Sequence, residues 1–284
     1  MAEIKTLEVS QQAEEKEIHL RKLLRDMQSV LVAYSGGVDS SYVALIATQE
    51  LGDKALCLTG VSPSLAQSEL RAAEKLALQF NFNHQTILTE ELENPGYTAN
   101  SPNRCYFCKS ELYQKLENFA RKLENPLIVD GSTTDDLSDF RPGRRAAHEK
   151  GVRSPLIEAN LSKAEIRALS RKHNLPTWSK PASPCLSSRV AYGIPISVER
   201  LSKVERGEAI LRTMGFHVFR VRYHGEIVRL EIASDEMEQI LQRSVIDLLT
   251  QQFRALGFRC VTLDLAGFRS GSMNEILEKT VENG

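Results

Sequence analysis

The residues best suited to chemistry are one glycine-rich string and three cysteines. The string Ser35-Gly36-Gly37-Val38-Asp39-Ser40 follows an apolar run at residues 30–34 and precedes a stretch with helical character. Glycines let the backbone approach an anion closely, and a helix N-terminus offers unpaired N–H groups and the positive end of a dipole. The spacing predicts a loop that binds nucleotide phosphates, with Ser35 and Ser40 as hydroxyl donors. The alternative is an ordinary strand-to-helix turn.

Asp39 and the turns after other predicted strands extend this prediction. A carboxylate repels phosphate, so Asp39 suits a Mg²⁺ ion or the orientation of the loop, and Asp136 is a second candidate metal contact beside the nucleotide. In a doubly wound sheet, ligands bind beyond the carboxyl ends of the strands. This rule predicts nucleotide contacts at Gly60, Gly131 and Thr133, for which a plain connection is the alternative.

The string lacks a lysine after its glycines. It therefore differs from the GxxxxGK[ST] loop of enzymes that cleave the γ-phosphate. The negative charge that develops during transfer of a nucleotide would be stabilised by cations and Mg²⁺. The candidates to hold phosphate or carboxylate are Arg141, Arg144, Arg145 and Lys180. Each of them alone is more often a solvated surface charge.

The cysteines form a pair and a distant single residue. Cys105 and Cys108 make a CxxC pair at the end of a stretch, residues 93–108, whose prolines and glycine predict a loop. A CxxC pair alone fits a redox or persulfide-carrying couple, half of a zinc site, or no special role. Zinc prefers four Cys or His ligands, whereas three thiolates, with Cys185 as the third, fit a [4Fe-4S] cluster that leaves one iron open.

The setting of each remaining cysteine differs. Cys185 lies among prolines and serines next to Arg189, which favours an exposed and ionised thiol with a function. Cys57 and Cys260 lie inside apolar strands, where a thiol usually fills the core.

Alternating strands and helices must position these residues in the first half of the chain. Such alternation predicts a parallel sheet with crossover helices, so we expect a doubly wound α/β domain over residues 1–195. A long functional loop is expected over residues 132–155. The predicted helices cover 13–29, 40–51, 64–80, 109–123 and 162–173, and the predicted strands cover 30–34, 55–59, 84–88 and 126–129.

The regular alternation of predicted strands and helices ends after residue 195. A smaller α+β domain is expected over residues 196–284, with possible roles in assembly and in contact with substrate phosphate. Its predicted elements are helices over 197–213 and 234–255 and strands over 216–223, 226–232 and 258–264.

Composition narrows the class of protein. The chain has 284 residues and a net charge of −1, so a nucleic-acid partner is not expected. It has no apolar run of about 18 residues, which predicts no membrane span. The polar first 20 residues do not resemble a signal peptide. We therefore expect a cytoplasmic protein whose thiols stay reduced.

The glycine string matches the signature of the PP-loop ATPases, which adenylate a carboxylate or carbonyl and release pyrophosphate. With the CxxC pair and the third cysteine, nearly the whole chain resembles the LarE family, the pyridinium-3,5-bisthiocarboxylic acid mononucleotide synthases. The resemblance to tRNA-thiolating PP-loop enzymes is weaker. The motifs that carry the resemblance to the LarE family are AYSGGVDSS (33–41), NRCYFCK (103–109), DGSTTDDLSDFRPG (130–143), WSKPASPCLSSRVAYG (178–193) and FRVRYHG (219–225).

This resemblance implies an ATP-dependent sulfur insertase. Its nucleotide substrate would be pyridinium-3,5-biscarboxylic acid mononucleotide, whose carboxylates are adenylated and become thiocarboxylates of the nickel-pincer cofactor. In three-cysteine members, the thiols matching Cys105, Cys108 and Cys185 hold a [4Fe-4S] cluster that delivers an added sulfide. In single-cysteine members, the thiol matching Cys185 gives up its own sulfur and becomes dehydroalanine. Because this chain has all three thiols, we expect the cluster version, with sulfide or a sulfur-donor protein as partner.

The resemblance also implies substrate-binding residues in the second half of the chain. Glu208, Arg220 and Arg222 match positions associated with substrate phosphate or metal at a subunit contact, so we expect a homo-oligomer. Arg189, beside the third thiol, is a further candidate. The alternative for the two strand arginines is a solvated face.

Three other functions stay open on the sequence. A tRNA thiolase would need an RNA-binding surface, and neither a basic extension nor an aromatic-rich module is visible. A synthetase of the GMP or NAD type would use ammonia and leave the thiols idle. An ATP-sensing module would bind nucleotide without releasing pyrophosphate.

Overall fold

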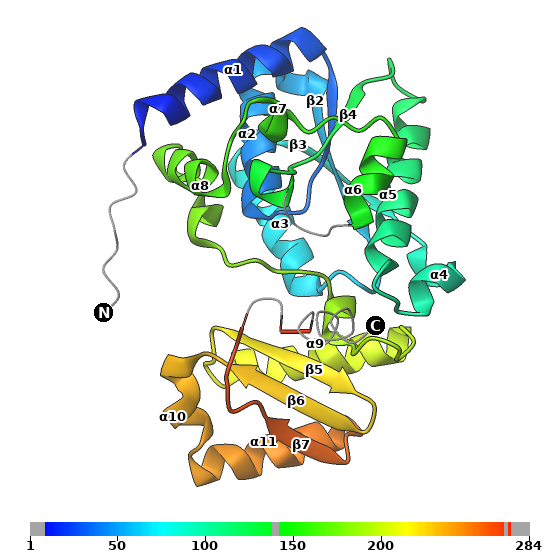
Figure 1. Cartoon of the computed structure of the whole chain (residues 1–284), viewed down its shortest axis with the longest axis vertical. Helices are drawn as coiled ribbons and strands as arrows, with labels where there is room; N and C mark the ends of the chain where they lie inside the picture. Colours follow the sequence, from blue (N-terminus) through cyan, green and yellow to red (C-terminus); the bar gives the residue numbers. More distant parts are fainter. Residues whose placement is uncertain (1–8, 138–141, 270–271, 274–284) are drawn as a thin grey trace, which may run out of the picture. The chain divides into compact units, whose positions relative to one another are not determined.

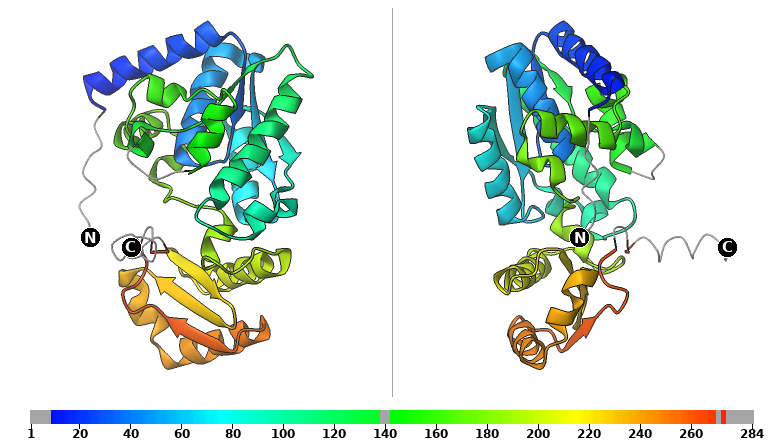
Figure 2. Two further views of the ribbon diagram at one scale, coloured as in Figure 1. Left: turned by 45° about the vertical axis from the view of Figure 1, so that its right-hand side comes forward. Right: turned by 90° about the vertical axis from the view of Figure 1, so that its left-hand side faces the viewer.

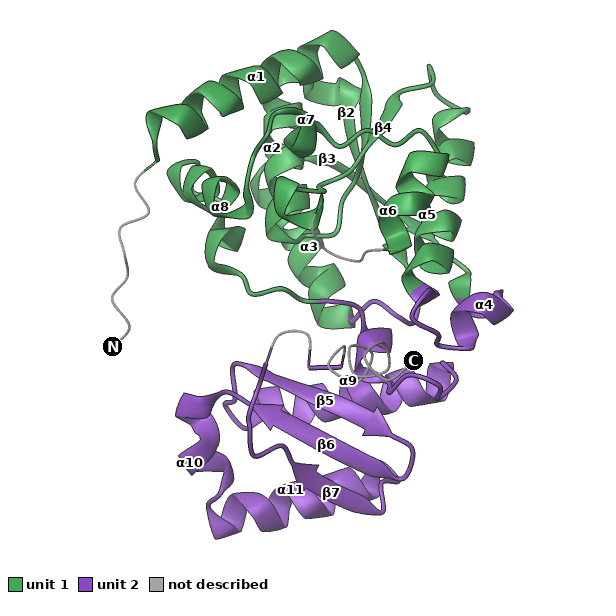
Figure 3. Cartoon of the chain, viewed as in Figure 1, with its two compact units in different colours: residues 1–62, 67–91, 105–183 green, residues 63–66, 92–104, 184–284 purple. Residues whose placement is uncertain are grey.

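The chain folds into two compact units, which are described separately. The computed structural model describes residues 9–137, 142–269 and 272–273. The first unit comprises residues 1–62, 67–91 and 105–183, and the second comprises residues 63–66, 92–104 and 184–284 (Figure 3). The functional division expected at residue 195 stays a prediction, because compactness does not reveal what each part does. Among the described residues, no helix is long and apolar enough to cross a membrane.

A four-stranded parallel sheet with the order β3-β2-β1-β4 lies at the centre of the first unit (Figure 1). Val30 pairs with Ala55 on one side and with Leu127 on the other. Because the chain leaves β3 and returns beside β1, the strand order reverses between β1 and β4. In doubly wound folds, ligands bind beyond the carboxyl ends of the strands at such a reversal. The strands are β1 (Val30–Ala33), β2 (Ala55–Val61), β3 (Asn83–Leu88) and β4 (Leu127–Val129).

Helices cover both faces of this sheet, which confirms the predicted α/β class. Val30 and Val32 join one apolar core with residues of α1, α2, α3, α7 and α8, while Leu31 joins a second core with residues of α5 and α6. The alternation follows from the two-residue period of a strand. The helices are α1 (Gln11–Met27), α2 (Val38–Leu51), α3 (Gln67–Gln79), α5 (Arg104–Ala120), α6 (Pro142–Glu149), α7 (Pro155–Glu158) and α8 (Lys163–Lys172).

Two predicted loops of the first half contain helix. The stretch 93–108 includes the short α4 (Pro95–Thr98) and the first turn of α5, so the prediction that the CxxC pair lies in a loop is wrong. Pro102 stays in the turn before α5, where a missing N–H does not interrupt the helix. The stretch 132–155 contains α6, whose Ala146 and Ala147 are buried against the sheet. The helix predicted over 162–173 is confirmed as α8, which begins at a capping box formed by Ser162 and Glu165.

The second unit is built on the three-stranded sheet β5-β6-β7, in which β5 and β6 are antiparallel and β6 and β7 are parallel (Figures 1 and 2). The predicted helix over 234–255 is interrupted, because the backbone at Gln242 is extended with ψ 133°. The elements are α9 (Val198–Thr213), β5 (Phe219–His224), β6 (Ile227–Ile232), α10 (Met237–Ile240), α11 (Arg243–Ala255) and β7 (Cys260–Leu263).

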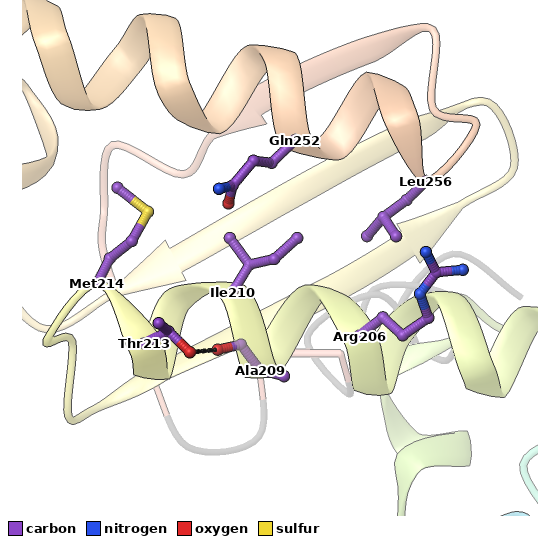
Figure 4. A pocket seen from close by; sticks show the side chains of 7 residues that line it. All are labelled: Arg206, Ala209, Ile210, Thr213, Met214, Gln252 and Leu256. Carbon is purple, nitrogen blue, oxygen red and sulfur yellow. Dashed lines mark hydrogen bonds between the residues drawn. The ribbon is translucent and has the colours of Figure 1, made fainter.

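Close packing joins α9 to α11. A Cβ atom at Gly207 would lie 2.8 Å from the Phe253 ring, so only glycine fits at this point of α9. Farther along, a pocket of about 350 Å³ opens between the two helices, with Ile210, Met214 and Leu256 in its lining (Figure 4). Its lining is largely apolar and offers little of the chemistry that the sequence predicts.

Candidate functional site

The glycine string forms a closed loop between β1 and α2. Ser40 Oγ lies 3.0 Å from Ser35 Oγ and accepts a hydrogen bond from Ser35 N at 3.2 Å. Gly37 is the N-cap of α2 and has no side chain to cap the first turn. The N–H groups of this turn can therefore serve an anion, and the helix dipole favours negative charge there.

Gly36 is required at its position for two reasons. Its φ is +68°, and a Cβ atom there would lie 2.7 Å from Ala73 Cβ of α3. The hydroxyl of Tyr34 donates to Ala73 O at 3.1 Å, which ties the end of β1 to the same helix. Helix α3 thus packs against the loop at Gly36.

Asp39 offers an oxygen suited to a cation. Lys163 Nζ of α8 lies 3.3 Å from Asp39 Oδ2, while Oδ1 is buried and has no hydrogen-bond partner among the described residues. Burial holds the pKa of Asp39 above its usual range, and the nearby Asp136 adds to this rise while Lys163 opposes it. A buried carboxylate oxygen next to a phosphate-binding turn fits a hard divalent cation such as Mg²⁺.

The turn after β4 meets the first turn of α2. A Cβ atom at Gly131 would lie 2.7 Å from Ser40 N, so the two turns touch through their backbones. Thr133 donates from N and Oγ1 to Asp136 Oδ2 at 2.9 and 3.2 Å. The structure thereby gathers Ser40, Gly131 and the two carboxylates at the carboxyl ends of β1 and β4.

The other predicted nucleotide contacts have varied settings. A Cβ atom at Gly60 would lie 2.8 Å from Leu112 Cδ1, so close packing already explains this glycine. Arg144 Nη1 donates to Asp136 O at 3.1 Å, and the guanidinium of Arg145 lies 4.1 Å from the centre of the Tyr106 ring. Arg141 lies outside the described residues.

Lys180 comes to the loop from a distant segment. Its Nζ donates to Gly36 O at 3.1 Å and to Glu69 Oε2 of α3 at 2.7 Å. Ser183 Oγ donates to the other oxygen of Glu69 at 3.0 Å. The segment from Lys180 to Ser183 is therefore fastened to α3 beside the glycine string.

The CxxC pair lies on the first turn of α5. Residues three apart on a helix share one side, so Cys105 and Cys108 present their thiols together. Cys105 is exposed and Cys108 is half-buried. The phenol oxygen of Tyr113, Asp130 and the two cysteines raise the pKa of the adjacent Lys109. This ammonium gives the pair an electropositive neighbour.

Cys185 belongs to the second unit and stands at the start of a 3₁₀ turn over Leu186–Arg189. Its carbonyl accepts hydrogen bonds from Ser188 N at 3.0 Å, Ser188 Oγ at 2.7 Å and Arg189 Nη1 at 3.1 Å. Leu186 N donates to Ser64 O at 2.8 Å. The backbone that carries this thiol is therefore firmly held.

The predicted substrate-binding residues lie within one buried charge cluster of the second unit. Arg189 Nε donates to Glu208 Oε1 at 2.9 Å, and Arg222 Nη2 donates to Glu231 Oε2 at 2.8 Å. Burial and the neighbouring Arg189 lower the pKa of Arg220 to about 10, which leaves it charged at neutral pH. Arginine guanidinium groups bind phosphate oxygens well, so the residue types of this cluster suit the predicted phosphate contact.

A [4Fe-4S] cluster is matched by the chemistry of the thiols but not by a gathered ligand set. Among residues 9–137, 142–269 and 272–273, no group of three His, Cys, Asp or Glu side chains is placed to hold a metal ion. The CxxC pair offers two thiols on one turn, and all five cysteines are thiols rather than disulfides. The three-cysteine set stays a prediction. Cys57 is buried as predicted, whereas Cys260 is exposed, so the prediction that it fills the core is wrong.

Sequence reasoning missed the residues that approach the loop from other helices. Lys163 is the first residue of α8, and Glu69 lies in the first turn of α3. Each looks like an ordinary surface charge in the sequence. Only the strand-order reversal could have suggested that helix ends far apart in the chain meet at this edge of the sheet.

Proteins from several organisms are similar to this chain over most of its length. It is 46% identical over 94% of its residues to an uncharacterized protein of Synechocystis, slr1717, and covers 99% of that protein. It is 36% identical over 93% of its residues to the pyridinium-3,5-bisthiocarboxylic acid mononucleotide synthase of Lactiplantibacillus plantarum, of which it covers 95%. An uncharacterized protein of Methanocaldococcus jannaschii, MJ0830, is 28% identical over 86% of the chain, which covers 92% of that protein.

The asparagine synthase family model matches residues 19–95, the part that includes the glycine string and α3. More distant similarity extends to GMP synthase of Streptococcus pneumoniae, at 26% identity over 68% of the chain and 40% of that protein.

Proposed function

Since the chain belongs to the LarE family, the pyridinium-3,5-bisthiocarboxylic acid mononucleotide synthases, we propose that it converts the carboxylates of pyridinium-3,5-biscarboxylic acid mononucleotide into thiocarboxylates. It is an ATP-dependent enzyme that transfers sulfur, built on a PP-loop domain. The substrate and the sulfur source are the proposed parts. The residues of the glycine loop and the three thiols support them.

The first step is adenylation. A substrate carboxylate oxygen attacks the α-phosphorus of ATP, the bond from that phosphorus to the bridging oxygen of the β-phosphate breaks, and pyrophosphate leaves. The turn at Gly37 supplies N–H donors to the phosphates, and Asp39 with Asp136 would hold Mg²⁺. When bound, Mg²⁺ would stabilise the developing charge on the phosphate oxygens. The observation that carries this assignment is Asp39 Oδ1, which is buried and has no hydrogen-bond partner within the described part of the chain.

The second step is attack of sulfur on the adenylated carbonyl carbon, with AMP as the leaving group. We assign the sulfur chemistry to Cys105, Cys108 and Cys185. These thiolates would hold a [4Fe-4S] cluster, whose chemistry would be the binding and delivery of an added sulfide. The alternative donor is the Cys185 sulfur itself, and the hydrogen bonds that fix its backbone would serve either version.

Substrate phosphate is assigned to the arginine cluster of the second unit. The guanidinium groups of Arg189, Arg220 and Arg222 are the donors assigned to it, since arginine binds phosphate oxygens through charge-assisted hydrogen bonds. We also propose that the protein works as a homo-oligomer in the cytoplasm, where thiols stay reduced, with sulfide or a sulfur-donor protein as partner.

An anaerobic assay tests the proposal. Protein reconstituted with iron and sulfide is mixed with the pyridinium substrate, ATP and Mg²⁺, and products are identified by mass spectrometry. Thiocarboxylate formed over several turnovers supports the cluster version. One turnover with dehydroalanine at position 185 supports the sacrificial version. Absence of any ATP-dependent thiocarboxylate would overturn the proposed function.

Iron and sulfide counts on single variants test the sulfur source separately. Wild type is expected to hold about four iron atoms per chain, as one [4Fe-4S] cluster requires. Cys105→Ala, Cys108→Ala and Cys185→Ala should each lose most of the absorption of the cluster, while Cys57→Ala should keep it. Equal iron in all variants would contradict the three-thiol assignment.

A further inference from the structure

The ammonium of Lys180 lies next to the glycine string, although Lys180 is more than 140 residues away in the chain. Its side chain is 22% exposed, and the Glu69 carboxylate with which it pairs is 27% exposed. Both groups are therefore close to solvent, where a nucleotide can reach them, and the pair is not part of the core.

Several contacts hold the lysine in this position. The next residue is Pro181, which favours an extended backbone at Lys180, and the observed ψ is 127°. Arg167 of α8 donates to Lys180 O at 2.8 Å. Ser183 fixes the far end of the segment on Glu69. The ammonium thus has little freedom to leave the loop.

The contacts leave the lysine able to bind an anion. A lysine ammonium has three N–H donors, and the bonds to Gly36 O and Glu69 Oε2 use two of them. The same loop presents backbone N–H groups at the N-terminus of α2, which favour negative charge. Because the glycine string contains no lysine, a cation from outside the string is needed beside the phosphates.

We propose that Lys180 is a nucleotide-binding residue whose ammonium contacts the diphosphate of ATP, with Glu69 as the positioning residue that holds it against the Gly36 carbonyl. This inference rests on the proposed function in one respect, namely that the loop binds ATP. Lys180 would stabilise the negative charge of pyrophosphate as the bond to the α-phosphorus breaks. It would make no contact with AMP, which lacks the diphosphate.

Ligand binding to the full chain with Mg²⁺ tests the proposal without any need for turnover. The probes are ATP, inorganic pyrophosphate and AMP, measured by calorimetry. Lys180→Met should weaken ATP and pyrophosphate roughly 10- to 100-fold, the effect of one charged hydrogen bond, and leave AMP within about twofold. Lys180→Arg should restore part of the loss. The control is Lys115→Met, which removes a partly exposed lysine of α5 that pairs with Glu90. This variant should change none of the three affinities.

A double-variant experiment tests the positioning role of Glu69. Glu69→Gln should weaken ATP less than Lys180→Met does, and the double variant should be no weaker than Lys180→Met alone, because Glu69 acts through the lysine. If Lys180→Met weakens AMP as much as ATP, or leaves ATP unchanged, the proposal is wrong. If wild type itself binds neither ATP nor pyrophosphate, the proposed function fails instead, so the two failures are distinct.

Discussion

Lys163 Nζ lies 3.3 Å from Asp39 Oδ2, so an ammonium group from α8 partly balances the carboxylate at the first turn of α2. The other oxygen of Asp39 is buried without a partner among the described residues. A divalent cation that binds this carboxylate must do so beside an existing positive charge. The lysine therefore limits the strength of the proposed magnesium site.

Lys163→Met should lower the Mg²⁺ concentration that gives half-maximal pyrophosphate release. A unit charge about 4 Å away is worth about 1 kcal/mol even at the dielectric constant of water, which corresponds to about fivefold. The control is Lys172→Met on the same helix, whose lysine is 45% exposed and pairs with Glu14. A half-saturating Mg²⁺ concentration that stays the same or rises in Lys163→Met would contradict this assignment.

Gly36→Ala should abolish nucleotide binding, whereas Gly52→Ala should keep it. Both glycines have positive φ, +68° and +57°, so both substitutions strain the backbone. Only at Gly36 does the new methyl group meet another atom, Ala73 Cβ at 2.7 Å, whereas nothing lies within 4 Å at Gly52. Calorimetric titration with ATP compares the two. Equal ATP affinity in both variants would show that the loop tolerates displacement from α3.

The loop and the helices that flank it were predictable because their signals are local. An apolar run that stops at two glycines shows the end of β1, and the Ser162–Glu165 box shows the start of α8. The start of α5 was mispredicted, because Pro102 suggested a loop although it lies in the turn before the helix. Lys163 and Glu69 gain their positions only from the order of the strands, so no local pattern could identify them.

Arg189→Met should lower the free energy of unfolding of the second unit by about 3 kcal/mol, because it leaves Glu208 buried without its partner. Arg189→Met combined with Glu208→Gln should recover part of this loss, since no unpaired charge remains. Urea unfolding measures both. The control is Arg259→Met, whose exposed pair with Glu226 should contribute little. A double variant as unstable as the sum of the single variants would contradict the ion-pair explanation.

Acid should loosen the contact between α1 and the end of α8. Burial raises the pKa of Glu17, but hydrogen bonds from His173 and Arg21 prevail and lower it to about 2. Since this value lies below the ordinary value of 4.5, the stabilisation is present above pH 4.5 and is lost as pH falls toward 2. The shift corresponds to about 3 kcal/mol at most.

Glu17→Gln should therefore lower the free energy of unfolding at pH 7 by about 2 kcal/mol and flatten its dependence on pH below 4.5. Urea unfolding at a series of pH values gives both quantities. The control Glu14→Gln changes an exposed pair on the same helix and should leave the pH profile intact. A wild-type stability that does not fall between pH 4.5 and 2 would be incompatible with this role of Glu17.

Phosphorus NMR of the anaerobic reaction measures directly which bond of ATP is broken and whether sulfur transfer depends on it. With the pyridinium substrate, Mg²⁺ and a sulfide source, we expect AMP and pyrophosphate in equal amounts, one of each for every thiocarboxylate formed. Without the pyridinium substrate, ATP should persist. Release of ADP and phosphate, or thiocarboxylate formed while ATP stays intact, would contradict the proposed reaction.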